Sequence, residues 1–211
     1  LAGCSGSDDP SSDAASGGTP AATGSSSPTA TTSPYLPVPD GVELTPPGSQ
    51  LSVGDSAVVA YRPRQDEVGA LDITVTALEK ASILKTLSAW QLSPEQRRSN
   101  PYFVRARIEN VGDTDLGGRP VPLYLLDGDN VLLESTPFAS SFELCPSTPF
   151  PDKFGPGDRT RVCLVYLAPD HGRAEAVSFR PEETFNPITW TGDVERYQPS
   201  KPTNSKKPKQ Q

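Results

Sequence analysis

The sequence contains no methionine and only one histidine, His171, in 211 residues. Few of the thioether and imidazole ligands that transition metals prefer are therefore present, and no bound metal is expected. No run of 18 apolar residues occurs, so a transmembrane helix is not predicted. A Gly-x-Ser-x-Gly nucleophile motif and a glycine-rich phosphate loop are also missing. These absences predict a protein that is not an enzyme and has no cofactor.

Basic residues are missing from the first 50 positions, where every charged residue is acidic. The net charge of the whole chain is −7, and its pI is near 4.8. Binding to nucleic acid requires clustered Lys and Arg, so the composition argues against it. The C-terminal tail is basic, and it either contacts an anionic surface or stays unengaged. Its lysines are Lys201, Lys206, Lys207 and Lys209.

Residues that can be buried are scarce at both ends of the chain. Residues 1–48 consist largely of Ser, Thr, Gly, Ala, Pro and Asp, and the last 14 residues are also polar. Such segments cannot bury enough apolar surface to offset the entropy of ordering them. We therefore predict a disordered tether over 1–48, one folded domain over 49–197 and a disordered basic tail over 198–211.

The central region has the period-two alternation of half-buried β-strands. In 71–77 and 104–108, apolar residues alternate with polar ones. The turn residues Asp127-Gly128-Asp129-Asn130 predict a hairpin, with a weak calcium contact as the alternative. Seven or so strands separated by short turns favour an all-β, antiparallel β-sandwich. The other predicted strands are 57–61, 121–126, 131–134, 161–167 and 174–179.

Two irregular stretches interrupt this pattern. Residues 83–100 contain Ser93-Pro94-Glu95-Gln96, a capping-box sequence that predicts a short helix within an inserted loop. Residues 135–153 are rich in Pro and Phe. Aromatic side chains on loops can form protein or glycan contact sites, but they can equally cover the edge of the sandwich. The candidate partner-binding residues are Trp90, Phe138, Phe142, Phe150 and Phe154.

Three cysteines are present: Cys4, Cys145 and Cys163. In an exported protein, Cys145 and Cys163 most simply form a disulfide; buried free thiols and metal ligands are the alternatives. His171 lies in a polar turn and has no recognisable nucleophile partner. The acidic pair Glu182-Glu183 is predicted to be solvated rather than catalytic.

The segment Leu1-Ala2-Gly3-Cys4 resembles a bacterial lipobox, in which the cysteine carries the lipid. A signal segment is then expected upstream of Leu1. The central region is similar to the immunoglobulin-like domains of unknown function in Gram-positive lipoproteins and secreted mycobacterial antigens. This resemblance rests on Val53-Gly54-Asp55, on Glu109-Asn110-Val111-Gly112, and on Gly157-Asp158 before the strand 162–167 and Pro169. It implies an extracellular sandwich without known catalysis.

These features predict a monomeric protein anchored by lipid at Cys4 to the outer face of the cell membrane. Its folded domain would be a non-catalytic binding or structural module, with an envelope protein or glycan as partner. The alternative is an accessory solute- or metal-binding lipoprotein that serves a transporter or an envelope system.

Overall fold

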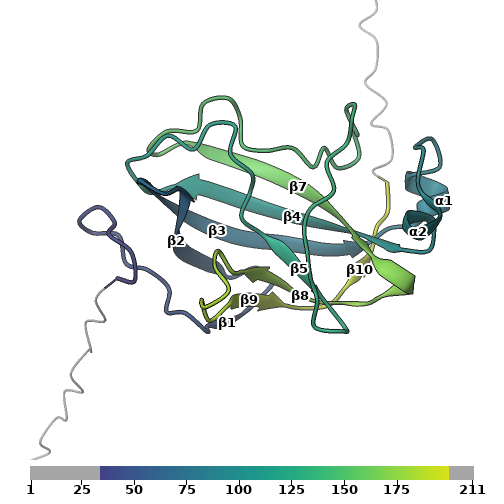
Figure 1. The fold of residues 1–211 in the computed structure, drawn as a ribbon, viewed down its shortest axis with the longest axis horizontal. Helices are drawn as coiled ribbons and strands as arrows, with labels where there is room; N and C mark the ends of the chain where they lie inside the picture. The colour runs from purple at the N-terminus through teal and green to yellow at the C-terminus, as the bar shows by residue number, and fades with distance from the viewer. Residues whose placement is uncertain (1–33, 200–211) are drawn as a thin grey trace, which may run out of the picture. The chain divides into compact units, whose positions relative to one another are not determined.

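The computed structural model describes residues 34–199, which form a sandwich of two β-sheets (Figure 1). Figure 1 shows β3, β4 and β7 side by side in one layer, with β8, β9 and β1 in the other. The predicted all-β sandwich is confirmed. Sheet A has the strand order β1 (Gln50–Ser52), β9 (Ile188–Thr191), β8 (Ala174–Phe179), β5 (Tyr124–Asp127), β6 (Leu132–Leu133). Sheet B has the order β10 (Glu195–Arg196), β3 (Glu67–Lys80), β4 (Asn100–Asn110), β7 (Arg159–Ala168), and β2 (Ser56–Arg64) also pairs with β3.

The main core lies between the two sheets. Successive side chains of a strand point to opposite faces, so the alternating pattern directs one set of residues inward. Leu71, Ile73 and Val75 of β3 are fully buried there, and Trp190 of β9 packs against the same cluster. The inward faces predicted for β3 and β4 are therefore confirmed.

Strand β3 is the longest strand and pairs with two strands along one edge. Its first part pairs with β2 and its last two residues with β10, and a register irregularity lies between Val75 and Ala77 opposite β4. The pairings β10–β3 and β1–β9 are parallel, whereas the sequence predicted antiparallel sheets. Both short strands arrive from distant segments without a hairpin, so no tight turn imposes an antiparallel direction.

The folded domain begins earlier than predicted. The Ala60 N–H donates to the Tyr35 hydroxyl at 2.8 Å, and the Tyr35 ring packs edge-on against Phe185 at 5.1 Å. Thr45 and Val58 exchange hydrogen bonds at 2.8 and 3.0 Å. Residues 34–48 therefore cover the outer edge of β2, and assigning them to a tether was wrong. Edge strands commonly need such covering because they expose unpaired backbone groups.

The inserted loop between β3 and β4 contains two short helices, α1 (Ile83–Thr86) and α2 (Pro94–Arg97), at one end of the domain (Figure 1). The predicted capping box is confirmed: Ser93 Oγ accepts from the Gln96 N–H, and Gln96 Oε1 accepts from the Ser93 N–H. A single 3-10 turn, η1 (Pro169–His171), follows β7. The short strands β1, β9 and β10 were not predicted.

The predictions for residues 1–33 and 200–211, including lipidation of Cys4, lie outside the described residues. Among the helices of residues 34–199, none is long and apolar enough to cross a membrane.

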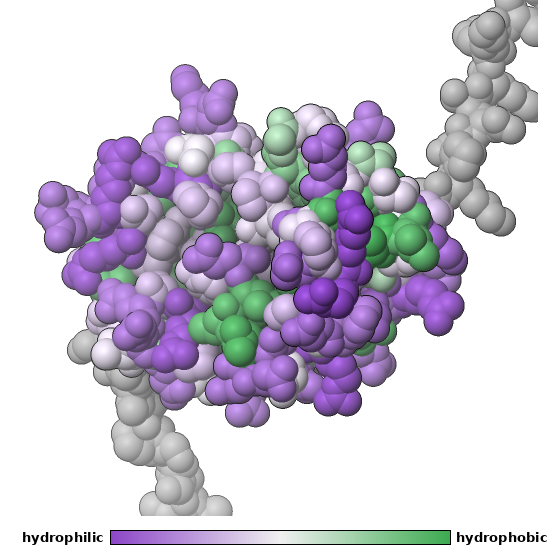
Figure 2. Space-filling model, turned by 45° about the vertical axis from the view of Figure 1, so that its right-hand side comes forward, coloured by the Kyte–Doolittle hydropathy of each residue, from purple (hydrophilic) through white to green (hydrophobic). Residues whose placement is uncertain are grey.

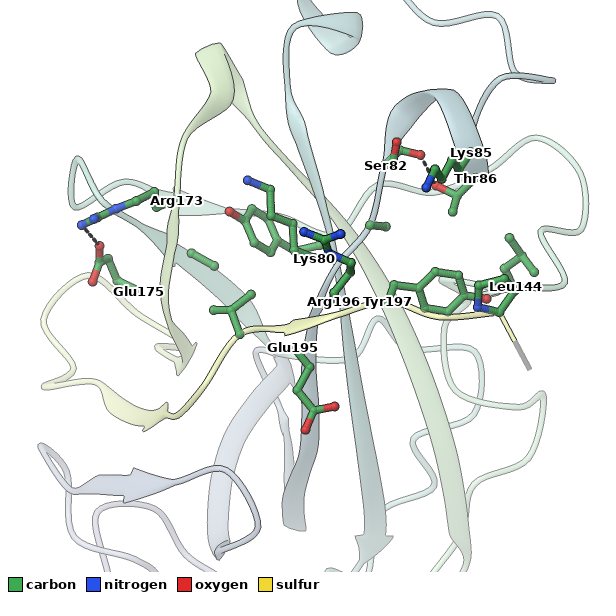
Figure 3. A pocket seen from close by; sticks show the side chains of 15 residues that line it. Lys80, Ser82, Lys85, Thr86, Leu144, Arg173, Glu175, Glu195, Arg196 and Tyr197 are labelled. Atoms are coloured by element: carbon green, nitrogen blue, oxygen red, sulfur yellow. Dashed lines mark hydrogen bonds and ion pairs between the residues drawn. The ribbon is translucent and has the colours of Figure 1, made fainter. Parts of the chain in front are cut away.

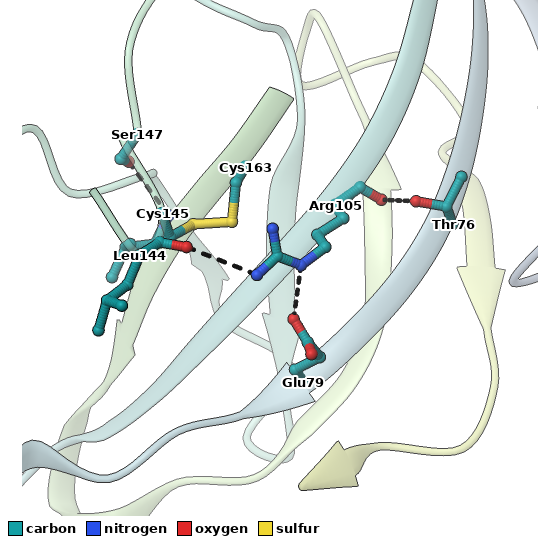
Figure 4. The surroundings of a disulfide bond; sticks show 8 residues. Thr76, Glu79, Arg105, Leu144, Cys145, Ser147 and Cys163 are labelled. Carbon is teal, nitrogen blue, oxygen red and sulfur yellow. Dashed lines mark hydrogen bonds and ion pairs between the residues drawn. A yellow bond between two sulfur atoms is a disulfide. The ribbon is translucent and has the colours of Figure 1, made fainter. Parts of the chain in front are cut away.

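The predicted disulfide between Cys145 and Cys163 is confirmed, with the two Cα atoms 5.0 Å apart (Figure 4). Cys163 belongs to β7, and Cys145 belongs to the long loop between β6 and β7. The Ser147 N–H also donates to the Cys163 carbonyl at 2.8 Å. The bond therefore fastens this loop to the outer face of sheet B.

We expect the double substitution Cys145→Ser and Cys163→Ser to lower the free energy of unfolding by about 2–4 kcal/mol, because the denatured chain loses a cross-link. Urea denaturation followed by tryptophan fluorescence measures this change. The wild-type protein in excess reductant is the control, and its stability should fall to that of the variant. Equal stabilities of the oxidised protein and the variant would contradict the expectation.

Candidate binding groove

Three of the candidate aromatic residues gather on the outer face of sheet B. Trp90 lies 4.6 Å from Phe138 and 5.9 Å from Phe142, measured between ring centroids. Phe142 also contacts Phe103 of β4 edge-on at 5.8 Å. Together with Tyr197, which lies 4.9 Å from Phe103, these residues form the aromatic cluster. The cluster packs beside the disulfide as a second, smaller core.

Partner contact was the wrong prediction for Phe142, Phe150 and Phe154. Their exposed fractions are 5%, 3% and 1%, because the loops fold back onto the sheets instead of projecting into solvent. Phe150 and Phe154 stack on each other at 4.6 Å and belong to the main core. Trp90 and Phe138 are partly buried and pack against the smaller core. These rings cover the sandwich, which was the alternative interpretation.

A hollow lies elsewhere on the domain, where β10 joins the end of β3 (Figure 3). It has a volume of about 860 Å³ and is bordered by β8, β10 and α1. Pairing between β10 and β3 builds one side of it, since the Tyr197 N–H donates to the Lys80 carbonyl at 2.9 Å. We call this hollow the β10 groove. Its charged and aromatic lining residues are Lys80, Lys85, Tyr102, Arg173, Glu175, Glu195, Arg196 and Tyr197.

Positive charge dominates the β10 groove. Lys80 and Arg196 are directly opposite each other in the β3–β10 register, and Lys85 lies on neighbouring α1. None of these three cations belongs to an ion pair within residues 34–199. Of the two carboxylates in the lining, Glu175 pairs with Arg173 at 2.8 Å. The other, Glu195, projects away from Lys80 and Arg196 in Figure 3.

Apolar side chains border the same groove. Leu144 is 37% exposed and Val194 is 39% exposed, and Figure 2 shows hydrophobic patches set among hydrophilic residues on the face that includes the helical end. Tyr102 lies at the groove with its ring buried, and its hydroxyl donates to the Gly172 carbonyl at 3.1 Å. Burial raises the pKa of Tyr102, so this hydroxyl stays protonated. The groove thus combines cations, hydroxyl groups and apolar contacts.

Sequence reasoning did not identify the β10 groove. Lys80 lies three residues beyond the predicted strand 71–77, and Arg196 lies in a short polar segment near the predicted tail. The two become neighbours only through a parallel pairing between segments more than 100 residues apart. No local sequence signal encodes that pairing.

A second charged surface occupies the half of the outer face of sheet B that the aromatic cluster leaves uncovered. Arg105 Nε pairs with Glu79 at 2.7 Å (Figure 4), and Arg159 Nε pairs with Glu109 at 2.9 Å. Arg107 and Arg161 are register partners on β4 and β7. Like charges directly opposite each other on paired strands are unfavourable. We call these four arginines the arginine ladder.

Asp72 lies beside the arginine ladder on β3, opposite Glu109 in register. Its Oδ1 is buried and has no hydrogen-bond partner among the described residues. Burial raises the pKa of Asp72, and the Ser56 side chain opposes this shift. The ionised carboxylate is therefore destabilised in the folded protein.

The remaining candidate residues are not assembled into a site. His171 is exposed at φ 61°, and its backbone N–H donates to the Arg98 carbonyl at 2.9 Å. Asp127 Oδ1 accepts from the Asp129 and Val131 N–H groups at 3.0 and 2.8 Å, which confirms the hairpin turn. Glu182 and Glu183 are exposed. Within residues 34–199, no group of three His, Cys, Asp or Glu residues is placed to hold a metal ion.

No protein-family model and no curated protein matches the chain. Among solved structures, it is similar to an uncharacterized β-sandwich protein from Clostridium difficile 630. The identity is 13% and the TM-score is 0.40, and the match covers 74% of this chain and 99% of that one.

We expect Asp72→Asn to stabilise the domain at neutral pH by less than about 1 kcal/mol, because solvent screens part of the penalty of the charged carboxylate. The pKa of Asp72 is higher in the folded state than in the unfolded state, so protonation of this carboxyl group stabilises the folded protein. This stabilisation is complete below the pKa of the unfolded state, which is about 3.9. That contribution is lost as pH rises through the folded-state pKa. Thermal unfolding at a series of pH values should therefore show the variant and wild type converging at low pH. A constant difference across all pH values would contradict this assignment.

Proposed function

We propose that this protein is a non-catalytic binding protein, anchored by lipid at Cys4 outside the cytoplasm, whose β10 groove binds an acidic glycan of the cell envelope. The observation that carries the binding proposal is a set of three cations around the groove that have no carboxylate partner within residues 34–199: Lys80, Lys85 and Arg196. The anchoring proposal rests on the lipobox-like sequence Leu1-Ala2-Gly3-Cys4.

The disulfide supports the proposed location. Structural disulfides persist in oxidising compartments and are rare in the cytosol, where thiols are kept reduced. Cys145 is fully buried, and Cys163 is only 8% exposed. Such a bond is typical of a structural role in an exported protein.

The chemistry of the groove favours a carboxylated or sulfated glycan. Lys80 and Arg196 supply adjacent positive charges, and each can hydrogen-bond to an anionic group. Ser82 adds a hydroxyl group, and the aromatic face of Tyr197 offers an apolar contact for a sugar ring. A chain of acidic sugars carries all the complementary groups at once.

Replacing Cys4 tests the anchor. With its signal segment supplied, the wild-type protein should incorporate radiolabelled palmitate and sediment with membranes. Cys4→Ala should lose both properties because the thiol is the attachment point. Cys145→Ser/Cys163→Ser is the matched control, since it also removes cysteine but should keep the label. Membrane sedimentation and labelling of Cys4→Ala at wild-type levels would disprove lipid anchoring.

Charge reversal tests the groove. We expect Lys80→Glu/Arg196→Glu to weaken binding to polygalacturonate by about tenfold or more, because two charge-assisted contacts become repulsive. Binding should also fall as salt rises, because both partners are charged. Isothermal titration calorimetry measures both effects.

The control variant is Arg97→Glu/Lys153→Glu, which changes the net charge equally at exposed positions outside the groove. It should bind polygalacturonate nearly as tightly as wild type. Neutral dextran should not bind, and polyglutamate should bind more weakly than polygalacturonate. Equal losses of affinity for polygalacturonate in both double variants would show non-specific charge attraction. Tighter binding of polyglutamate than of polygalacturonate would favour an acidic protein partner. Either result would reject the glycan site.

A further inference from the structure

A hollow of about 400 Å³ lies on the outer face of sheet B and shares no lining residue with the β10 groove. Its lining comes from β3, β4 and β7 and from the loop between β6 and β7. The disulfide holds this loop beside the hollow, since Cys145 is bonded to Cys163 in the lining. We call it the ladder hollow, because three members of the arginine ladder line it: Arg105, Arg107 and Arg161.

Two of these arginines are open to solvent on the same face. Arg107 and Arg161 are directly opposite each other on β4 and β7. Side chains in such positions lie on one face of the sheet, with Cβ atoms about 4.5–5.5 Å apart. Ala106 and Ile108 are buried in the main core, so the alternation places Arg107 on the outer face. Both arginines are exposed there and line the hollow, so a ligand in it can reach them.

The charges of these two arginines are not balanced within the described part of the chain. Neither Arg107 nor Arg161 belongs to an ion pair within residues 34–199. Like charges directly opposite each other on paired strands destabilise a sheet. Arg105 is the third cation of the hollow, but it pairs with Glu79. An anion between the two guanidinium groups would therefore remove an unfavourable interaction as well as form favourable ones.

Carboxylates that would repel an anion lie on a neighbouring part of the same face. Among the described residues, no aspartate or glutamate lines the ladder hollow. An adjoining hollow of about 770 Å³ has three in its lining: Asp55, Asp72 and Glu109. Of these, Glu109 is paired with Arg159. We therefore expect an anion at the end of the face near Cys163, where the lining has only positive charge.

We propose that the ladder hollow binds a phosphate monoester group. At neutral pH such a group carries a charge of about −1.5 to −2 and has three strong acceptor oxygens. Arg107 and Arg161 donate to different oxygens, so each guanidinium forms a charge-assisted hydrogen bond. A carboxylate carries a single charge and would balance only one of them. Thr148, which is exposed, adds a hydroxyl group to the lining. The site is separate from the β10 groove and does not depend on the lipid anchor.

Calorimetric titration of the full chain with glycerol 3-phosphate, dimethyl phosphate and acetate tests the ligand class. In a low-salt buffer without phosphate, the monoester should bind at least about tenfold more tightly than the other two, because each of them carries a single charge. Two-dimensional amide NMR should place the shifted signals in 105–107 and 161–163. Equal binding of monoester and diester, no binding of glycerol 3-phosphate at millimolar concentration, or shifts confined to the β10 groove would overturn the proposal.

A substitution of both arginines separates ligand contact from structural support. Arg107→Gln/Arg161→Gln should bind glycerol 3-phosphate at least about tenfold more weakly. Its melting temperature should equal or exceed that of wild type, because the like charges are removed from opposite positions. The control Arg97→Gln/Lys153→Gln changes the net charge equally at exposed positions outside the hollow and should bind normally. Equal losses in both variants, or wild-type affinity in Arg107→Gln/Arg161→Gln, would reject the site.

Vesicles distinguish a soluble phosphate ester from a lipid headgroup, since phosphatidate carries the same monoester group. The unlipidated protein is sedimented with phosphatidylcholine vesicles, with and without phosphatidate. Sedimentation that requires both phosphatidate and the two arginines identifies the headgroup as the source, and binding of glycerol 3-phosphate without sedimentation identifies a soluble ester. Both results support the phosphate site, whereas equal sedimentation of wild type and Arg107→Gln/Arg161→Gln would count against it.

Discussion

The structure depends on one constraint: strands β4 and β7 are apolar on both faces near the helical end of the domain. Phe103 and Val165 point away from the main core, yet both are fully buried. An exposed apolar sheet face of this kind would be costly in water, so other parts of the chain must cover it. The inserted loop over 81–99 and the long loop between β6 and β7 provide that cover. The disulfide holds the second of these loops against β7 at Cys163.

The outer face of sheet B therefore has two regions, one apolar and one charged. Next to the disulfide, the aromatic cluster belongs to the smaller apolar core. Farther along the same strands, Arg105, Arg107 and Arg161 replace the apolar residues, and the face stays open to solvent. Aromatic side chains on the loops are consequently used for covering the sheet. Polar side chains at the margin of that cover, including Lys80 and Lys85, are left available for contacts with other molecules.

Local sequence patterns were sufficient for much of the fold but not for the groove. Alternation predicted β3 and β4, the turn residues from Asp127 predicted a hairpin, and Ser93 with Gln96 predicted a helix start, because each signal lies within a few residues. Tyr35 was missed because its partners are Ala60 and Phe185, far along the chain. Likewise, hydropathy marks Phe142 as apolar but does not specify whether its loop folds onto a sheet or projects into solvent.

Departures from apolar packing arise where regular strand pairing ends, and the β10 groove is one of them. Tyr61 is the last residue of β2 in continuous register with β3 before an irregularity, and Lys80 is the last residue of β3. At such ends, the two sheets no longer fill the space between them with alternating apolar side chains, and polar groups can enter. Tyr61 stands at an inward position of the alternating pattern, so the sequence predicts burial of its side chain. It does not predict that the ring and the hydroxyl group have different surroundings. The structure separates them, since the ring packs with the main core and the hydroxyl has no hydrogen-bond partner within residues 34–199. Such a difference between the ring and the hydroxyl of one side chain is recognisable only after hydrogen bonds have been assigned.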